Sequence, residues 1–258
     1  MAFAKSLLIV SLVVAVVSTA LAGKCPKPSS RLVLHGIGEN AHKLRPTVDL
    51  FNKLLGGDDN GSNPGPLKEG RRSINWDAGI VPFNFPGDFF AKVVTRGLTV
   101  SNKDGKFAVS NPPVDANKTL VDDKFDSINK RAAEDFLTFS PERLFSPVKQ
   151  NKVTIKFSVP AKHDAALVKG FGAVFVDVDK KLQTKAVYYD YNGCKIAEEY
   201  VDKQRNGLSF LGVIFDSPII ARVDIYLGAA PIGGYKRGDF VVMDDFLYSE
   251  PQAIPHYY

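Results

Sequence analysis

Residues 169–179, KGFGAVFVDVD, combine an apolar run with glycines near its start and two carboxylates at its end. A short apolar run bounded in this way is typical of a buried central strand. Valines alternate with a phenylalanine and the acids, so one face stays apolar while the other becomes charged. We predict a core strand here, with Asp177 and Asp179 at its end as candidate ligand-binding residues.

The rest of the chain predicts more strands of the same kind. Short segments rich in β-branched and aromatic residues are separated by Gly, Pro and Asn turns. They occupy residues 93–100, 106–110, 153–159, 186–189, 208–215, 219–227 and 240–248. Residues 190–193, DYNG, predict a hairpin turn, because Asn-Gly readily adopts the positive φ angles that such a turn needs.

These elements define the fold class. Residues 132–139 allow one or two helical turns, and residues 48–55 fit a strand or a short helix equally well. The sequence has neither the long amphipathic helices of a βαβ fold nor a repeat of constant period. We therefore predict an all-β protein, a jelly-roll-like β-sandwich of two antiparallel sheets with minor helical turns.

The N-terminus predicts secretion. An apolar run at residues 7–17 follows Lys5 and precedes the small residues 20–22, the pattern of a signal peptide cleaved after Ala22. The alternative, a membrane anchor, is disfavoured because the run is shorter than the roughly 20 residues that span a bilayer. We predict a secreted, extracellular protein with no transmembrane segment in the mature chain.

The domain boundaries follow from these signals. Residues 1–22 form the signal peptide, and the Pro- and Lys-punctuated residues 23–47 are predicted to be an arm lying over the domain. Residues 48–251 form the β-sandwich domain. Residues 252–258, which follow a proline, are predicted to be a loose tail.

The chain contains two cysteines, Cys25 and Cys194. Two lone thiols commonly pair in an oxidising compartment, so we predict a disulfide between them; the alternatives are two free thiols or an intermolecular link. Asn60 and Asn117 each begin an N-x-S/T triplet and are candidate glycosylation sites.

Composition excludes several classes of function. The formal net charge is +5, of which Lys5 contributes one, leaving +4 after signal removal with acids and bases interspersed. Basic tracts and aromatic-basic motifs are absent, so we predict no nucleic-acid partner. No nucleophile elbow, Cys-His pair or phosphate loop is present, and we assign no catalytic residue.

Carboxylates are the conspicuous polar residues within apolar runs. Asp77, Asp244 and Asp245 are candidate ligands for Ca²⁺, which accepts six to eight oxygen atoms. The alternative is that these acids are solvated or hydrogen-bond turn amides. Glu198 or Glu199 with one of the aspartates is the candidate acid pair for glycoside hydrolysis.

Trp76 is the single tryptophan. An exposed indole stacks on sugar rings, which makes Trp76 a candidate ligand-binding residue, whereas a buried indole fills the core. We favour core burial, because Trp76 follows an alternating strand-like segment.

Residues 70–77, GRRSINWD, resemble the GRR-x-I-N-W-D signature of a group of uncharacterised secreted proteins. Residues 85–90 (FPGDFF), 95–97 (TRG), 170–175 (GFGAVF), 208–213 (LSFLGV) and 242–246 (VMDDF) resemble its later segments. The resemblance covers about residues 48–251. It implies a jelly-roll-like β-sandwich and no established activity.

These observations favour a non-catalytic extracellular or cell-surface module that binds glycan. A sandwich with surface loops and aromatic residues needs no further motif to bind sugar, whereas catalysis requires a positioned acid and base. The alternatives are a secreted carbohydrate-active enzyme that uses paired carboxylates and a purely structural wall or matrix component.

Overall fold

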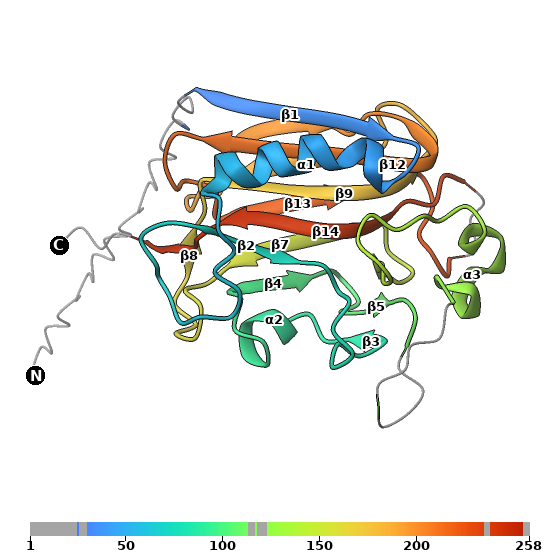
Figure 1. Ribbon diagram of the computed structural model, residues 1–258, viewed down its shortest axis with the longest axis horizontal. Coiled ribbons are helices and arrows are strands. Elements are labelled where there is room, and N and C mark those ends of the chain that lie inside the picture. The colour runs from blue at the N-terminus through green and yellow to red at the C-terminus, as the bar shows by residue number, and fades with distance from the viewer. Residues whose placement is uncertain (1–24, 26–29, 113–116, 118–122, 235–237, 255–258) are drawn as a thin grey trace, which may run out of the picture.

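The computed structural model describes Cys25, residues 30–112, Asn117, and residues 123–234 and 238–254 (Figure 1). The predicted signal peptide and residues 255–258 of the predicted tail lie outside this part of the chain. Two antiparallel sheets pack face to face, which confirms the predicted all-β sandwich. No helix among the described residues is long and apolar enough to cross a membrane.

The described residues form an eight-stranded and a five-stranded sheet. Across the first lie β1 (Arg31–Gly38), β12 (Gln204–Phe215), β9 (Gly170–Val178), β14 (Val242–Ser249), β6 (Phe145–Pro147), β5 (Phe107–Val109) and β3 (Asn84–Phe85), with β2 (Arg71–Ile74) also pairing with β14. Across the second lie β11 (Lys195–Tyr200), β10 (Lys185–Tyr189), β13 (Arg222–Tyr226), β7 (Lys152–Phe157) and β4 (Leu98–Ser101). A small ladder joins β15 (Gln252–Ala253) to β8 (Ala166–Leu167).

Strand β9 is the buried central strand that the sequence predicts. It pairs with β12 on one side and β14 on the other, and all of its residues are buried. Gly172 of β9 lies opposite Gly212 of β12. A Cβ atom on Gly212 would lie 2.4 Å from Phe51 of the covering helix, so glycine is required where the helix approaches the sheet.

That covering helix, α1 (Ala41–Leu55), lies over the eight-stranded sheet and runs roughly along its strands (Figure 1). Asn40 caps it by accepting a 3.1 Å hydrogen bond from the Lys43 backbone N–H. Leu44, Val48, Phe51 and Leu55 recur at helical spacing and are buried. The other helices, α2 (Phe89–Lys92) and α3 (Asp126–Ala133), are short.

The structure corrects the predicted arm at residues 23–47. Residues 31–38 are an edge strand of the sheet, and the predicted boundary at residue 47 falls inside α1. Pro46 lies within the helix, and glycines lie within β1, which made this region look irregular. The predicted tail also begins with β15, so its first two residues belong to the fold.

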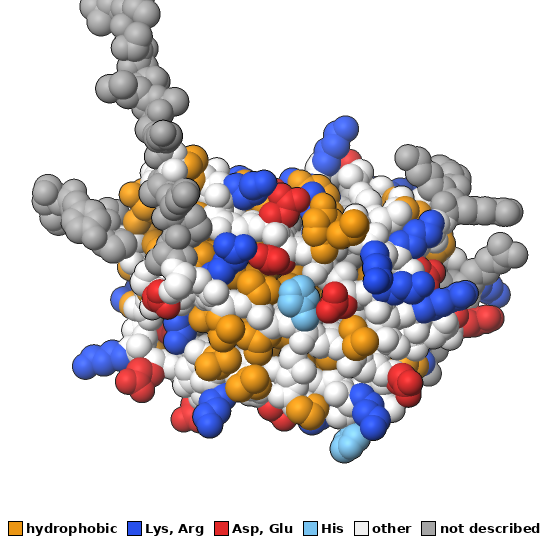
Figure 2. All heavy atoms as spheres, turned by 90° about the horizontal axis from the view of Figure 1, so that it is seen from above, with side chains coloured by type: hydrophobic (Ala, Val, Ile, Leu, Met, Phe, Trp, Pro, Cys, Tyr) orange, Lys and Arg blue, Asp and Glu red, His pale blue; other side chains and the backbone are white. Residues whose placement is uncertain are grey.

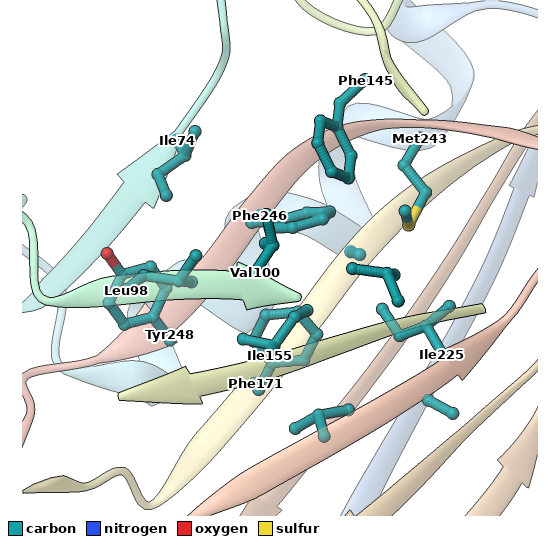
Figure 3. Close-up of a cluster of buried hydrophobic side chains, with 14 of the residues drawn as sticks. Ile74, Leu98, Val100, Phe145, Ile155, Phe171, Ile225, Met243, Phe246 and Tyr248 are labelled. Atoms are coloured by element: carbon teal, nitrogen blue, oxygen red, sulfur yellow. The ribbon is translucent and has the colours of Figure 1, made fainter. Parts of the chain in front are cut away.

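Apolar side chains fill the space between the sheets (Figure 3). Phe171 of β9 and Phe246 and Tyr248 of β14 come from the eight-stranded sheet. Ile155 of β7 and Leu98 of β4 meet them from the five-stranded sheet. A second apolar cluster lies between α1 and the outer face of the eight-stranded sheet.

The predicted disulfide between Cys25 and Cys194 is present, with 5.6 Å between the Cα atoms. Cys194 follows the turn that joins β10 to β11, and Gly193 in this turn has φ 81°, which confirms the predicted hairpin. On the face seen in Figure 2, basic and acidic side chains are interspersed, as the sequence indicates.

Candidate functional site

The outer face of the five-stranded sheet carries polar and aromatic side chains at alternate positions. Val153, Ile155 and Tyr188 point into the core between the sheets. Side chains of a strand alternate between its two faces, so their neighbours point outward. We call this outward surface the tyrosine face; it consists of Lys152, Thr154, Lys156, Lys185, Val187, Tyr189, Lys195, Glu198, Tyr200, Arg222, Asp224 and Tyr226.

The first row of the tyrosine face runs across four strands as Lys152, Tyr226, Lys185 and Tyr200. The Lys152 ammonium lies 5.2 Å from the centre of the Tyr226 ring. The Lys185 ammonium lies 5.5 Å from that ring and 5.4 Å from the Tyr200 ring. An aromatic ring attracts a cation at this distance. The row is therefore an alternation of cations and rings that hold one another in place.

The middle row contains the acids of the face. Asp224 lies opposite Thr154 and accepts a 2.8 Å hydrogen bond from its hydroxyl. Its carboxylate also contacts Lys152 at 2.9 Å and Arg222 at 3.5 Å. This single acid therefore bridges the two outer rows.

Glu198 occupies the other end of the middle row. Its carboxylate contacts Lys185 at 2.6 Å and Lys195 at 2.8 Å. Hydrogen bonds from Lys185 and Lys195 lower the pKa of Glu198 to about 2. Glu198 is therefore held ionised and serves as the second bridge between the outer rows.

The third row runs as Lys156, Arg222, Tyr189 and Lys195. The Arg222 guanidinium carbon lies 3.9 Å from the centre of the Tyr189 ring. This is the shortest of the cation–ring distances on the tyrosine face. Both outer rows thus combine cations with tyrosine rings.

The outer rows of the tyrosine face are open to solvent, whereas Val187 and Asp224 of the middle row are buried. The exposed fraction is 41% for the Lys152 side chain, 34% for that of Arg222 and 37% for Tyr200. The outer face of the eight-stranded sheet is covered instead by α1 and by apolar residues from the segment 123–144. The five-stranded sheet therefore offers the strand surface that a ligand can reach.

Glu198 and Glu199, each a candidate to act with an aspartate in glycoside hydrolysis, are both engaged in ion pairs. Adjacent residues of β11 point to opposite faces, and Glu199 forms an ion pair with Arg31 of β1 at 2.8 Å. A general acid needs a raised pKa, whereas that of Glu198 is lowered. This geometry favours structural roles for both glutamates.

The structure brings together the three acids predicted to bind calcium. Asp244 accepts hydrogen bonds from the backbone N–H groups of Phe139 and Ser140, at 2.6 and 3.3 Å. The Ser140 hydroxyl lies 3.1 Å from Asp244 and 2.6 Å from Asp245. Asp77 accepts hydrogen bonds from the backbone N–H groups of residues 142 and 143, at 2.7 and 3.0 Å. The three acids thus form hydrogen bonds with the same loop, residues 139–143.

The protonation of Ser140, Asp244 and Asp245 determines how this cluster is hydrogen-bonded. The Ser140 hydroxyl has one proton, so it donates to one carboxylate at a time. Burial, followed by the charge of Asp245, raises the pKa of Asp244, and burial likewise raises that of Asp245. No group of three or more His, Cys, Asp or Glu side chains in the described part of the chain is arranged to hold a metal ion. Calcium binding by Asp77, Asp244 and Asp245 stays a prediction.

Asp177 and Asp179 meet a third acid, Asp239, which precedes β14. Asp239 accepts a 3.1 Å hydrogen bond from the Asp179 backbone N–H, and Asp177 accepts one of 2.8 Å from Asn206. The Asp179 carboxylate lies 3.5 Å from Arg205. Asp177 and Asp239 thus accept hydrogen bonds from backbone N–H groups of β12 and of the residue after β9. Ligand binding by Asp177 and Asp179 stays a prediction.

Trp76 is a core residue, with an exposed fraction of 1%. Its ring stacks on Phe145 at 4.3 Å, and its indole N–H donates a 2.9 Å hydrogen bond to the backbone carbonyl of Asp244. No ring face is left for a sugar. The structure therefore supports burial and corrects the candidate role of Trp76 in ligand binding.

The two candidate glycosylation sites differ in structure. The Asn60 side-chain nitrogen, which would carry the sugar, donates to the Glu69 carbonyl at 2.8 Å and to Glu250 at 2.9 Å. A glycan would replace one of these hydrogens, so Asn60 is a poor acceptor in the folded protein. Asn117 is exposed in a turn, and its glycosylation stays a prediction.

The melting temperature is expected to fall by a few degrees as the pH rises from 5 to 7.5. Burial raises the pKa of both Asp77 and Asp177 from 3.8 to about 6. Between the unfolded-state pKa of 3.8 and the folded-state pKa of about 6, the folded state binds more protons than the unfolded state. The stability contributed by the two protonated acids is therefore fully present below about pH 4 and is lost as the pH rises through about 6. Calorimetry at several pH values measures the change.

The variant Asp77→Asn is expected to reduce this pH dependence, because asparagine keeps the acceptor oxygen without titrating. Asp49→Asn, at an exposed position of α1, serves as the control. A melting temperature that rises between pH 5 and 7.5 would contradict the expectation.

Comparisons with known proteins give little further information. No protein-family model matches the chain, and no curated protein matches it in sequence. Among solved structures, the enzymatically active domain of tailspike protein 4 from bacteriophage CBA120 is similar over 68% of this chain and 23% of that chain, with 11% identity and a TM-score of 0.27. The chain thus spans under a quarter of that protein's length, and similarity this low carries no argument about function.

Apart from Glu198, a candidate for the acid pair, the residues of the tyrosine face were not among those predicted from the sequence. The sequence signal for the face is the set of outward-facing positions, every second residue, in KVTIK, KAVYY and RVDIY, which are segments of β7, β10 and β13. The apolar half of the same alternation predicted the core. The order of the strands, which places the polar positions in rows, is not visible in any one segment.

Proposed function

We propose that the protein is a secreted, non-catalytic glycan-binding module and that the tyrosine face is its binding surface. The observation that carries this proposal is the ordered alternation of tyrosine rings and cations on an uncovered sheet. The disulfide supports an extracellular location, because such bonds persist in oxidising compartments.

The chemistry of the tyrosine face suits a sugar polymer. Glycans present many hydroxyl groups that donate and accept hydrogen bonds, and ammonium, guanidinium, carboxylate and phenol groups are matching partners. The rows fix these groups before a ligand arrives, which reduces the entropy lost on binding. An extended surface also suits an extended chain better than a small molecule, which prefers a concave pocket.

Replacing Tyr226 by alanine is expected to weaken glycan binding about tenfold, corresponding to the loss of one stacking or hydrogen-bonding anchor. Tyr226 lies between Lys152 and Lys185, so its removal also takes away the ring that both ammonium groups contact. A glycan array followed by titration calorimetry with the best ligand measures the change.

Tyr191→Ala is the matched control, since Tyr191 is 62% exposed in the β10–β11 turn, outside the tyrosine face. Equal losses for the two variants would contradict this location of the site. A silent array would favour a structural wall or matrix protein. Release of reducing sugar from a polysaccharide would favour a carbohydrate-active enzyme.

A further inference from the structure

The geometry points to an anionic polysaccharide, carrying carboxylate or sulfate groups, as the ligand of the tyrosine face. This inference rests on the proposed glycan-binding function and specifies its ligand class. It follows from the balance of charge on the face, the way the acids are already used, and the spacing of the cations.

Cations outnumber acids on the tyrosine face. The cations are Lys152, Lys156, Lys185, Lys195 and Arg222, and the acids are Glu198 and Asp224. Five positive and two negative charges leave a formal surplus of +3 on this surface. The whole chain has +5 from 33 basic and 28 acidic residues, so a large part of its surplus is gathered here.

Each of the two acids already contacts two cations of the face. Asp224 contacts Lys152 and Arg222, and Glu198 contacts Lys185 and Lys195, so each acid balances one of two cations. An ammonium group has three donors and a guanidinium has five, which leaves donors for further acceptors. Charge-assisted hydrogen bonds to carboxylate or sulfate are the strongest that these groups can form.

Lys156 is the clearest free cation. It is exposed, and no ion pair involves it among the described residues. It lies opposite Arg222 in the third row, next to the guanidinium that stacks on Tyr189. An anionic group placed over this row would meet two adjacent cations.

The spacing favours a polymer over a single anion. Lys152 and Lys156 belong to the first and third rows and lie four residues apart on β7. At about 3.3 Å per residue, the two rows are roughly 13 Å apart along the strands. The positions between the rows where one carboxylate contacts both are already taken by Asp224 and Glu198. A further single anion therefore contacts the cations of one row, whereas a chain with repeated acidic groups contacts both rows at once and gains from multivalency.

The test compares matched polysaccharides that differ in charge alone. The disulfide-bonded full chain is titrated with polygalacturonate and with its methyl ester, and with chondroitin sulfate and desulfated chondroitin. We expect the anionic member of at least one pair to bind at least tenfold more tightly than its neutral or less charged partner. We also expect binding to weaken as salt is raised from about 0.05 to 0.5 M, because salt screens charge interactions between exposed groups.

Variants localise the effect. Lys156→Gln and Lys185→Gln, one from each outer row, are each expected to weaken anionic binding about tenfold, as the loss of one charge-assisted hydrogen bond predicts. Lys43→Gln, on α1 and over the other sheet, removes the same charge and is expected to change nothing. Circular dichroism of each variant confirms that the fold is retained.

The outcomes separate this inference from the proposed function. Equal binding of charged and uncharged partners, with loss on Tyr226→Ala, would refute the anionic ligand and keep glycan binding. No binding to these polysaccharides or to a glycan array would refute both. Equal affinity for vesicles of anionic lipid would show a non-selective cationic surface and overturn the inference.

Discussion

Replacing Arg72 by methionine is expected to lower the free energy of unfolding by about 3–5 kcal/mol, the cost of leaving a buried charge without its partner. The side chains of Arg72 and Glu250 are 0% and 3% exposed, and their ion pair joins β2 to the residue after β14 at 2.7 Å. A total stability of about 5–15 kcal/mol makes such a loss a large fraction of the whole.

The cost is large because both side chains are fully engaged. Arg72 also donates to the backbone carbonyls of Gly61 and Asn63, at 2.8 and 2.9 Å. Glu250 also accepts from the Leu67 backbone N–H at 3.1 Å. The pair therefore fixes the loop before β2 as well as the strand, and removing the guanidinium leaves several buried groups unpaired.

Chemical denaturation of Arg72→Met measures the change. Arg31→Met is the matched control, because the Arg31–Glu199 pair is 39% and 20% exposed and such pairs contribute about 0–1 kcal/mol. The double variant Arg72→Met with Glu250→Leu is expected to lose less than the two single variants added together. A loss no greater than that of Arg31→Met would show that the pair contributes little.

Removing the disulfide is expected to lower the free energy of unfolding by about 2–5 kcal/mol. Cys25 and Cys194 are 169 residues apart, and loop-closure entropy for such a separation corresponds to about 5 kcal/mol, which strain usually reduces. Cys194→Ser thus releases the N-terminal end of the chain from the β10–β11 hairpin.

Thermal melts with and without reductant measure this contribution. Cys25→Ser and Cys194→Ser are expected to be equally destabilised and, in a double variant, insensitive to reductant. A melting temperature that reductant leaves unchanged in the unsubstituted protein would contradict the expectation. Persistent sensitivity of the double variant would point to an effect of reductant unrelated to this bond.

The sequence identified features whose signal is local. β9 is buried on both faces and therefore reads as a continuous apolar run, which is why its position could be predicted. α1 was only half recognised, because Pro46 interrupts the pattern although Leu44 and Val48 keep helical spacing. Tertiary packing supplied the stability that local propensity did not indicate.

The sites depend on relations between distant strands. Asp77 and Asp244 were both identified as important acids, but the Ser140 loop that they hold lies in neither segment. Tyr226 and Lys185 are separated by 41 positions in the chain and become neighbours only through the pairing of β10 with β13. Patterns within one strand predict which face is polar and leave open which side chains meet.

The coverage of one sheet by α1, with the other sheet left open, gives the molecule two unlike sides. Under the proposed function, a monomer binds a polymer chain through one strand surface, the tyrosine face. Cross-linking would require two copies joined back to back through their helical sides. With the tyrosine face as the proposed glycan site, the arrangement of helix and sheets predicts that a single copy coats a polymer chain rather than bridging two chains.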